Sequence, residues 1–409
     1  MNKAFKILQP KYYSKFQCDP IKCHESCCER WKIIIDKSTY EKYIQSENKI
    51  IKEIVKTGLS INEESINDDD FAIINLNTEM ACPFLNQDNL CEIFINIGES
   101  NLSKTCKSYP RAIILLEDKI ERGLEMSCSV ACELALLNEN GIEFDYIMDT
   151  VNFNDMYVVT PSIDLREKEI INEIKTSVID ILQIKTINLS EKVALVGEFL
   201  NQIVGSNNSL SHSTEETLSR IEESKSLFKQ GKVGIQKIHN IDQNKQSFHH
   251  LNNILSMKFK KGNSISFFSK RYVECLMEVL DAFEGEDEEF KKSYTRNYEK
   301  NLKPYLDKKS YILENFLVNY VFIYGIELFK PGNIWTSYLK LCVTYGLLKF
   351  NLIGLATYNE QMNDDLALKL IQSLAKTIIQ DKKYWQSVIK YLEEEKLDEY
   401  TKLITLILD

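Results

Sequence analysis

The chain has 409 residues, with 60 acidic against 50 basic side chains and a formal net charge of −10. A surface of this sign disfavours binding to the phosphate backbone of nucleic acid. A hydrophobic content of 44%, with only 14 glycines and 7 prolines, disfavours long disorder and favours helix. The length suits one large domain or two packed domains.

The N-terminal part changes its hydrophobic period often, which is typical of a small α+β region. WKIII (31–35) and FAIINL (71–76) predict short strands, and Asp36 is placed to cap a helix over 37–44. Residues 112–126 predict two short strands joined at Glu117 to Lys119.

Beyond Thr160 the pattern is helical almost throughout. Pro161 suits a first helical turn, so a helix start is predicted at Thr160, and Ser213 with Glu216 forms a capping-box signature. Helices are predicted over 164–184, 191–204, 217–230, 264–283, 288–302, 311–329, 337–358, 364–380, 382–394 and 397–408. The predicted fold is mainly α, with a cysteine-rich α+β domain (1–160) packed on a C-terminal helical bundle or array (161–409).

The most apolar stretches, 311–329 and 338–356, resemble membrane spans in length. They carry charged side chains, among them Glu314, Lys340 and Lys349, so both are predicted to be buried helices. The N-terminus shows no apolar run of signal-peptide type. We therefore expect a cytoplasmic protein without a membrane partner.

The cysteines are unevenly distributed. Of 11 cysteines, nine lie between Cys18 and Cys132. Cys275 and Cys342 stand in apolar helical surroundings and are predicted to be core residues.

Metal binding explains the early cysteines better than disulfides, which seldom persist in a reducing compartment. No CxxC pair occurs, which disfavours a four-cysteine zinc finger without excluding it. Thiolate ligation without histidine also suits an iron–sulfur cluster. His24, the one nearby histidine, is more typical of a solvated turn.

Several linked motifs resemble one known family. The run QPKYYSKFQC (9–18), then CHESCCERWKIIID (23–36) and TYEKY (39–43), is similar to the opening of the flagellin lysine-N-methylase family. CPFLNQDNLCEIF (82–94) and TCKSYPR (105–111) match it too, and also resemble the wider group of cysteine-rich zinc- or iron-chelating domains. MSCSVACELAL (126–136) matches less closely, which leaves Cys128 and Cys132 open.

The resemblance implies a protein-lysine N-methyltransferase that transfers methyl groups from S-adenosylmethionine to flagellin, with a 4Fe–4S cluster taking part. Adjacent Cys27 and Cys28 are not expected to bind one cluster together for steric reasons, and at least one of them is expected to be a ligand. The candidate ligands are Cys18, Cys23, Cys27, Cys28, Cys82, Cys91 and Cys106.

Arg111 and Tyr109 are the candidate cofactor-binding residues. The arginine suits a bidentate clamp on a carboxylate, and a structural salt bridge is the alternative. Tyr12, Tyr13 and Trp31 would shield the cysteines, stack on adenine or form core. No strand-linked GxGxxG and no CxxxCxxC triplet occurs, so neither a Rossmann-type site nor the usual radical triad is expected.

Two other functions remain open from the sequence. One is a protein-binding module stapled by zinc instead of iron and sulfide. The other is an iron–sulfur redox or sensor protein without methyl transfer.

Overall fold

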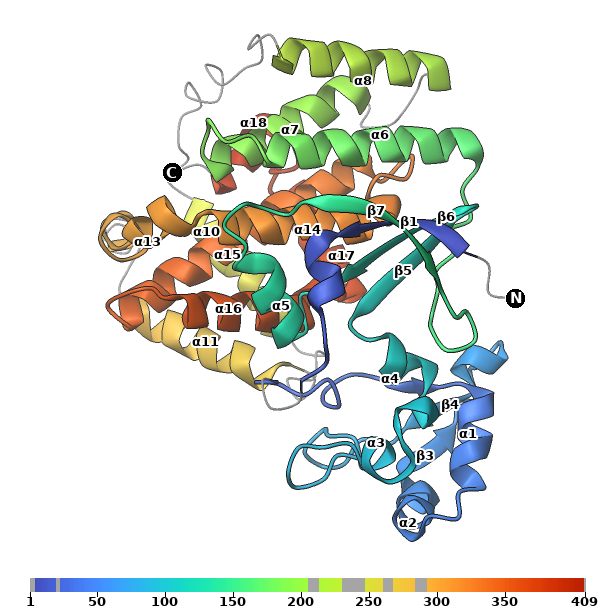
Figure 1. The fold of residues 1–409 in the computed structure, drawn as a ribbon. Helices are drawn as coiled ribbons and strands as arrows, with labels where there is room; N and C mark the ends of the chain where they lie inside the picture. The colour runs from blue at the N-terminus through green and yellow to red at the C-terminus, as the bar shows by residue number, and fades with distance from the viewer. Residues whose placement is uncertain are drawn as a thin grey trace. The chain divides into compact units, whose positions relative to one another are not determined.

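The computed structural model describes residues 4–19, 23–204, 213–229, 247–259, 268–283 and 293–407 (Figure 1). The chain forms two compact units. Unit 1 comprises Met1–Leu134, Phe144–Pro161 and Ser264–Lys270, and unit 2 comprises Ala135–Glu143, Ser162–Asn263 and Arg271–Asp409. The fold is mainly α with a small α+β N-terminal region, which confirms the predicted fold class.

A four-stranded sheet organises unit 1. Its order is β5-β6-β1-β7, with strands β1 (Ala4–Pro10), β5 (Arg111–Leu116), β6 (Lys119–Leu124) and β7 (Phe144–Thr150). The hairpin β5–β6 turns at Glu117 and Asp118, as predicted. β1 pairs parallel with β6 and antiparallel with β7.

Strands β1 and β7 were not predicted. β7 is an edge strand that leaves Tyr146 61% and Met148 68% exposed, so its sequence lacks a buried apolar alternation. β1 is a central strand that buries Phe5 and Ile7.

A second, three-stranded sheet has the order β2-β4-β3, from β2 (Ile34–Ile35), β3 (Leu59–Ile61) and β4 (Ala72–Ile74). It shares a hydrophobic core with helices α1 (Lys37–Ile44) and α2 (Lys49–Gly58), built around Ile35, Tyr43, Ile51 and Phe84. We call this part of unit 1 the small lobe. Helices α3 (Glu92–Ile97) and α4 (Lys104–Ser108) complete it.

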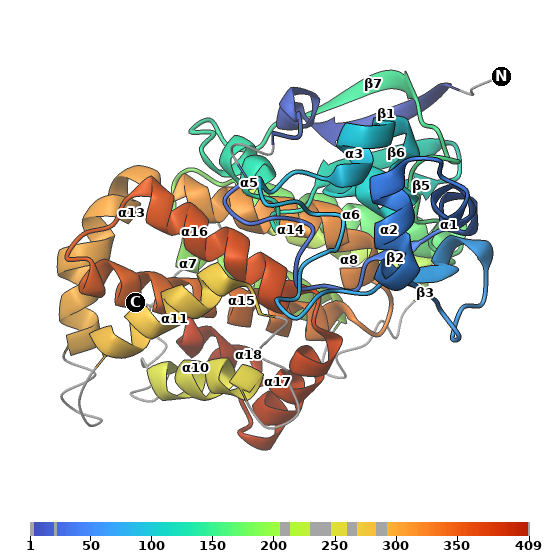
Figure 2. The same ribbon diagram turned by 90° about the horizontal axis from the view of Figure 1, so that it is seen from below.

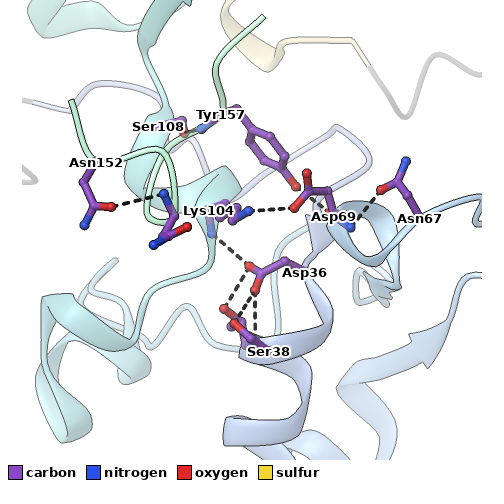
Figure 3. A network of polar contacts seen from close by, with 10 residues as sticks. Asp36, Ser38, Asn67, Asp69, Lys104, Ser108, Asn152 and Tyr157 are labelled. Carbon is purple, nitrogen blue, oxygen red and sulfur yellow. Dashed lines mark hydrogen bonds and ion pairs between the residues drawn. The ribbon is translucent and has the colours of Figure 1, made fainter. Parts of the chain in front are cut away.

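Asp36 is the polar centre of the small lobe. It caps α1 as predicted, accepting hydrogen bonds from the Thr39 amide (3.0 Å) and hydroxyl (2.8 Å) and from the Ser38 hydroxyl (2.9 Å). It also accepts one from the Lys104 amide (3.1 Å), at the first residue of α4 (Figure 3). The Lys104 ammonium pairs with Asp69 at 2.7 Å. The start of α1 and the start of α4 are thereby tied to one carboxylate.

A late segment of the chain completes unit 1. Arg30 Nη1 donates to the carbonyl of Phe268 at 3.2 Å, and Ser269 Oγ donates to Glu25 Oε2 at 2.8 Å. Residues far apart in sequence thus hold the segment that carries the first cysteines.

Unit 2 is built from helices (Figure 2). They are α6 (Leu165–Leu182), α7 (Leu189–Val204), α8 (Thr214–Lys229), α10 (Ser247–Ser256), α11 (Lys270–Ala282), α13 (Lys303–Lys309), α14 (Tyr311–Leu328), α15 (Ile334–Tyr358), α16 (Asp364–Leu374), α17 (Lys382–Glu394) and α18 (Tyr400–Leu403).

The first of these helices matches the predicted segment 164–184 and does not begin at Thr160. The helix start at Thr160 was wrong, because Asp164 and Glu167 form a capping box and α6 begins at Leu165. Each of these side chains accepts a backbone hydrogen bond from the other residue's amide, and this arrangement outweighs the preference of Pro161 for a first turn.

Helix α15 lies at the centre of unit 2, where it contacts α7, α10, α14 and α16. By length and composition it is the one helix among the described residues that is apolar enough to cross a membrane, and 94% of its apolar window is buried inside the protein. Cys342 on α15 and Cys275 on α11 are fully buried, which confirms their prediction as core residues. Gly197 of α7 lets the ring of Tyr338 approach the helix backbone closely.

Candidate functional site

Four predicted ligands gather on the core of the small lobe. Cys82 is buried in that core, and Cys28, Cys91 and Cys106 pack against it. The Cys82 amide donates a 2.7 Å hydrogen bond to the Cys28 carbonyl. Cys91 is the residue before α3, and Cys106 lies on α4. Three chain segments therefore deliver four thiols to one region.

A tight loop brings Cys82 and Cys91 together. The Asn86 side chain accepts hydrogen bonds from the amides of Asp88 (3.0 Å) and Leu90 (2.9 Å), and Asn89 adopts a positive φ of 60°. Asparagine tolerates these turn conformations, so the sequence NQDN reverses the chain here. Leu85 then pairs with Cys91 in a β-bridge.

Burial and neighbouring thiols both disfavour the thiolate form in this group. The pKa of Cys106 is raised to about 12, chiefly by burial and also by the nearby Cys28 and Cys91, against the effect of a hydrogen bond with Ser103. Burial likewise raises the pKa of Cys82, with Cys28, Cys106 and Cys91 adding to the effect. A metal ion would have to displace the protons from these thiols, because thiolate is the ligating form.

A second group contains a cysteine that sequence reasoning had left open. Burial raises the pKa of Cys128 to about 11; hydrogen bonds from the α5 (Ser129–Leu136) amides of Ala131 and Val130 oppose this shift, and Cys23 and Cys18 add to it. Burial also raises the pKa of Cys18, and Cys23 is the next contribution. The signal in the sequence was the third cysteine-containing motif, at 126–136.

Cys27 interacts with the thiol of its neighbour Cys28. A hydrogen bond with the neighbouring Cys28 thiol, together with burial, holds the pKa of Cys27 well above its usual range. Cys106 and Cys23 also lie close enough to raise it.

The cysteine thiols suit metals that prefer thiolate ligands. In their present positions these thiols do not form the ligand set of a metal ion. Within the described ranges, no three His, Cys, Asp or Glu side chains stand in an arrangement that would hold a metal ion as they are. All the predicted cysteine ligands belong to these ranges and all carry free thiols. Metal binding by these cysteines therefore requires their sulfur atoms to move closer together.

Arg111 lies beside the second group. Its guanidinium stacks on the Phe16 ring at 5.0 Å, donates to the Lys107 carbonyl at 3.3 Å, and lowers the pKa of Cys18 against the effect of burial. Tyr109 is held by its hydroxyl, which donates to Ser127 Oγ at 3.1 Å. The role of both residues toward a cofactor stays a prediction.

The aromatic residues around the first cysteines differ in their contacts. Tyr12 is buried in unit 1, and Tyr13 stacks on the guanidinium of Arg122 at 4.6 Å, which are structural roles. Trp31 donates from its indole nitrogen to the Cys27 carbonyl at 2.5 Å, and its ring lies 5.9 Å from that of Tyr109. Trp31 and Tyr109 thus form an aromatic pair beside the cysteines. His24 is exposed.

A family model described as the FliB lysine N-methylase C-terminal domain matches residues 175–406, which is more than half of the chain. The chain belongs to the FliB lysine N-methylase family. The family predicted from the cysteine-containing motifs is therefore confirmed, and the matched range covers most of unit 2.

Curated relatives of the family support this assignment. The chain is 30% identical over 127 residues to a lysine-N-methylase of Salmonella typhimurium and, to the same degree, to one of Salmonella choleraesuis. Each alignment covers 31% of this chain and 31% of the relative. The flagellar biosynthetic protein FliU of Salmonella muenchen is 30% identical over 127 residues, which is 74% of its length. No solved structure matches the chain.

Proposed function

We propose that this protein transfers methyl groups from S-adenosylmethionine to lysine side chains of flagellin, with a cysteine-ligated 4Fe–4S cluster taking part. The observation that carries the proposal is the family match over residues 175–406, with relatives named lysine-N-methylase. The name of the FliU relative supports a flagellar context. The convergence of thiols in unit 1 supports a metal centre.

The reaction would take place in the cytoplasm, where flagellin is still unassembled and its lysines are accessible. The long apolar helix α15 is buried within unit 2, which agrees with a protein that works in solution.

In a polar transfer the acceptor lysine must be a neutral amine, because an ammonium has no lone pair for a new bond to carbon, and a radical route is the alternative. When bound, S-adenosylmethionine supplies the methyl group and the cluster supplies an iron site for its amino and carboxylate groups. Arg111 would hold the carboxylate by a charge-assisted hydrogen bond from the guanidinium that now stacks on Phe16. Trp31 and Tyr109 would form an apolar wall beside it.

The test is a methylation assay with anaerobically purified protein. Flagellin and S-adenosylmethionine are added, and flagellin peptides are searched for methyl-sized mass increments on lysine. The Cys342→Ser variant is a suitable control, because this thiol is buried in unit 2 and is predicted to have no part in metal binding. Absence of methylated lysine with metal-loaded protein would refute the proposal.

A zinc-stapled binding module is the second candidate function. The packing of four cysteines on one hydrophobic core favours it, since closed four-cysteine sites are typical of structural zinc. In that case the purified protein is colourless and contains zinc without inorganic sulfide. A brown protein that contains iron and sulfide and methylates flagellin excludes this candidate.

A further inference from the structure

Strand β7 forms an open edge of the four-stranded sheet. The order β5-β6-β1-β7 places it last (Figure 2), and within the described residues no further strand pairs with its outer side. All 7 of its residues lie opposite residues of β1. An edge strand directs the N–H and C=O groups of alternate residues outward, where they can pair with another chain.

The opposite edge of the same sheet is occupied. Val159 forms a parallel bridge with Ile114 of β5. The Val159 amide donates to the Ile113 carbonyl, and its carbonyl accepts from the Leu115 amide, both at 2.9 Å. The sequence of β7, FDYIMDT, contains neither lysine nor proline, the residues that commonly protect an edge from further pairing. Of the two edges, β7 is therefore the one suited to accept another strand.

One face of β7 is apolar and exposed. Tyr146 and Met148 are 61% and 68% exposed, and they lie opposite Leu8 and Lys6 of β1. The Lys6 ammonium lies over the Tyr146 ring, 4.3 Å from its centroid. A strand added to β7 would make apolar contacts on this face, where the ammonium disfavours a second positive charge.

The other face of β7 is acidic. Asp145 and Asp149 alternate with Ile147 and point to the side of the buried Gln9. Asp149 is paired with Arg122 at 3.0 Å. Asp145 is half-buried, and its Oδ1 atom has no hydrogen-bond partner in the part of the protein that the structure describes. A buried acceptor without a partner is costly, so a cation on an added strand would stabilise this position.

These charges favour a basic peptide over a second copy of the chain. In a two-fold antiparallel pairing of β7 with β7 centred on Ile147, Asp145 of one copy would lie opposite Asp149 of the other. Like charges directly opposite destabilise a strand pair. A segment that places lysine opposite Asp145 forms a pair of opposite charges instead, and the net charge of −10 attracts such a segment.

We propose that the outer edge of β7 binds an extended, lysine-containing segment of a protein substrate as an added strand. Backbone hydrogen bonds supply affinity that depends little on sequence. Asp145 selects lysine on one face, and Tyr146 and Met148 select apolar residues on the other. The binding surface rests on the strand edge alone, whereas the claim that its occupant is the protein to be methylated rests on the proposed function.

Binding of labelled peptides to the full-length protein tests the proposal. The probe is the hexapeptide TVTVKT with a fluorescent group, which in antiparallel pairing sets lysine opposite Asp145 and valines opposite Tyr146 and Met148. Fluorescence anisotropy gives its Kd without S-adenosylmethionine. One control peptide carries glutamate in place of lysine. Two others are N-methylated at alternate amides, one on the valines and one on the residues between them.

Three protein variants accompany the wild type. Met148→Lys puts a protecting lysine on the exposed edge. Leu165→Lys is the matched control, because Leu165 at the start of α6 is 67% exposed, almost the same as Met148 at 68%. Asp145→Asn keeps the shape of the side chain and removes its charge.

The expected results separate backbone pairing from charge. Only one of the two N-methylated peptides binds, because only alternate amides of an added strand face its neighbour. Met148→Lys raises the Kd of the probe at least about 5-fold, and Leu165→Lys leaves it unchanged. Asp145→Asn reduces the preference for lysine over glutamate by about 3- to 10-fold.

Three results would overturn the proposal. Equal Kd values for Met148→Lys and Leu165→Lys, or tight binding of both N-methylated peptides, would refute strand addition. A wild-type dimer that Met148→Lys abolishes would assign the edge to a second copy. The proposed function is tested separately: peptide binding without methylation of flagellin would refute that function alone. An unchanged KM for flagellin in Met148→Lys would refute the edge as the substrate site and leave the function standing.

Discussion

The amide of Cys82 donates a hydrogen bond to the carbonyl of Cys28, with 2.7 Å between nitrogen and oxygen. This bond joins the N-terminal cysteine segment to the loop that ends at Cys91. It is a backbone interaction, so it survives the loss of either thiol. Substitutions of single cysteines in this region are therefore suitable for testing metal binding without removing the contact itself.

Replacing Asp36 with Ala is expected to destabilise unit 1 by about 1–3 kcal/mol. The change removes the cap of α1 and leaves the Lys104 amide and the Thr39 hydroxyl without their shared acceptor. Chemical denaturation of the variant measures the loss. Asp118→Ala, at the exposed β5–β6 turn, is the control and should be close to neutral.

Asp36 also predicts acid sensitivity. Burial raises its pKa, but hydrogen bonds from the Lys104 amide, the Thr39 hydroxyl and amide and the Ser38 hydroxyl more than offset this, so the pKa lies below its ordinary value. For a carboxyl with a lowered folded-state pKa, the stabilisation is complete above the unfolded value of about 3.9 and is lost as the pH falls through the folded value. Denaturation of the wild type and of Asp36→Asn is compared between about pH 6 and about pH 3. The free energy of unfolding should depend less on pH in the variant than in the wild type. Parallel curves would contradict this assignment.

Lys349 predicts a further rise of stability with pH, in the neutral to alkaline range. Burial lowers its pKa to about 7, while the unfolded chain keeps a value of about 10.4. Between these values the unfolded state binds more protons, so the unfolding free energy rises with pH. Lys349→Met should be more stable than wild type near pH 7 by about 1 kcal/mol or more. Its free energy of unfolding should not increase with pH as that of the wild type does. Lys390→Met, on the exposed face of α17, is the control. If the free energy of unfolding still rises with pH in Lys349→Met, another group causes the rise.

Replacing Gly197 with Ala should destabilise unit 2 although alanine favours helix. The added Cβ overlaps the Tyr338 ring, and the cost of overpacking, about 1–3 kcal/mol, exceeds the gain in helix propensity of about 1 kcal/mol. Gly346→Ala is the matched variant, because its Cβ would meet a Leu251 methyl at 2.9 Å, which can rotate, and the Leu406 carbonyl oxygen at 3.3 Å, so the overlap is smaller than at Gly197. A melting temperature that falls less for Gly197→Ala than for Gly346→Ala would be inconsistent with this packing.

Arg111→Lys should weaken methyl transfer through a higher KM for S-adenosylmethionine, on the order of 10- to 100-fold, because lysine cannot form the bidentate bond. Metal content should not change. Arg122→Lys on the neighbouring strand is the matched control, since Arg122 is already paired with Asp149 at 3.0 Å and Gln9 at 2.8 Å. Equal effects of both variants on KM would argue for a merely structural role of Arg111.

The sequence predicted features that depend on local chemistry. The Asp36 cap, the β5–β6 hairpin and the buried thiols of Cys275 and Cys342 follow from a few neighbouring residues, and all were predicted correctly. Strands β1 and β7 were missed because they pair with each other although they lie far apart in the sequence. A local hydrophobic period does not reveal such a pairing.

The gathering of four cysteines on one core was out of reach for the same reason. Spacing along the chain groups Cys27 with Cys28 and leaves Cys128 apart. Only the folded chain shows that Cys28, Cys91 and Cys106 pack against the core that buries Cys82.

The contacts of Phe268 and Ser269 with Arg30 and Glu25 bear on how the protein is made. When translation has reached Pro161, every strand of the two sheets has been synthesised, but Phe268 and Ser269 have not. The first cysteine segment gains its last two anchors only after more than half of the polypeptide has been translated. Truncated gene products that stop near residue 161 should therefore show faster proteolytic cleavage around residues 23–30 than the full-length chain.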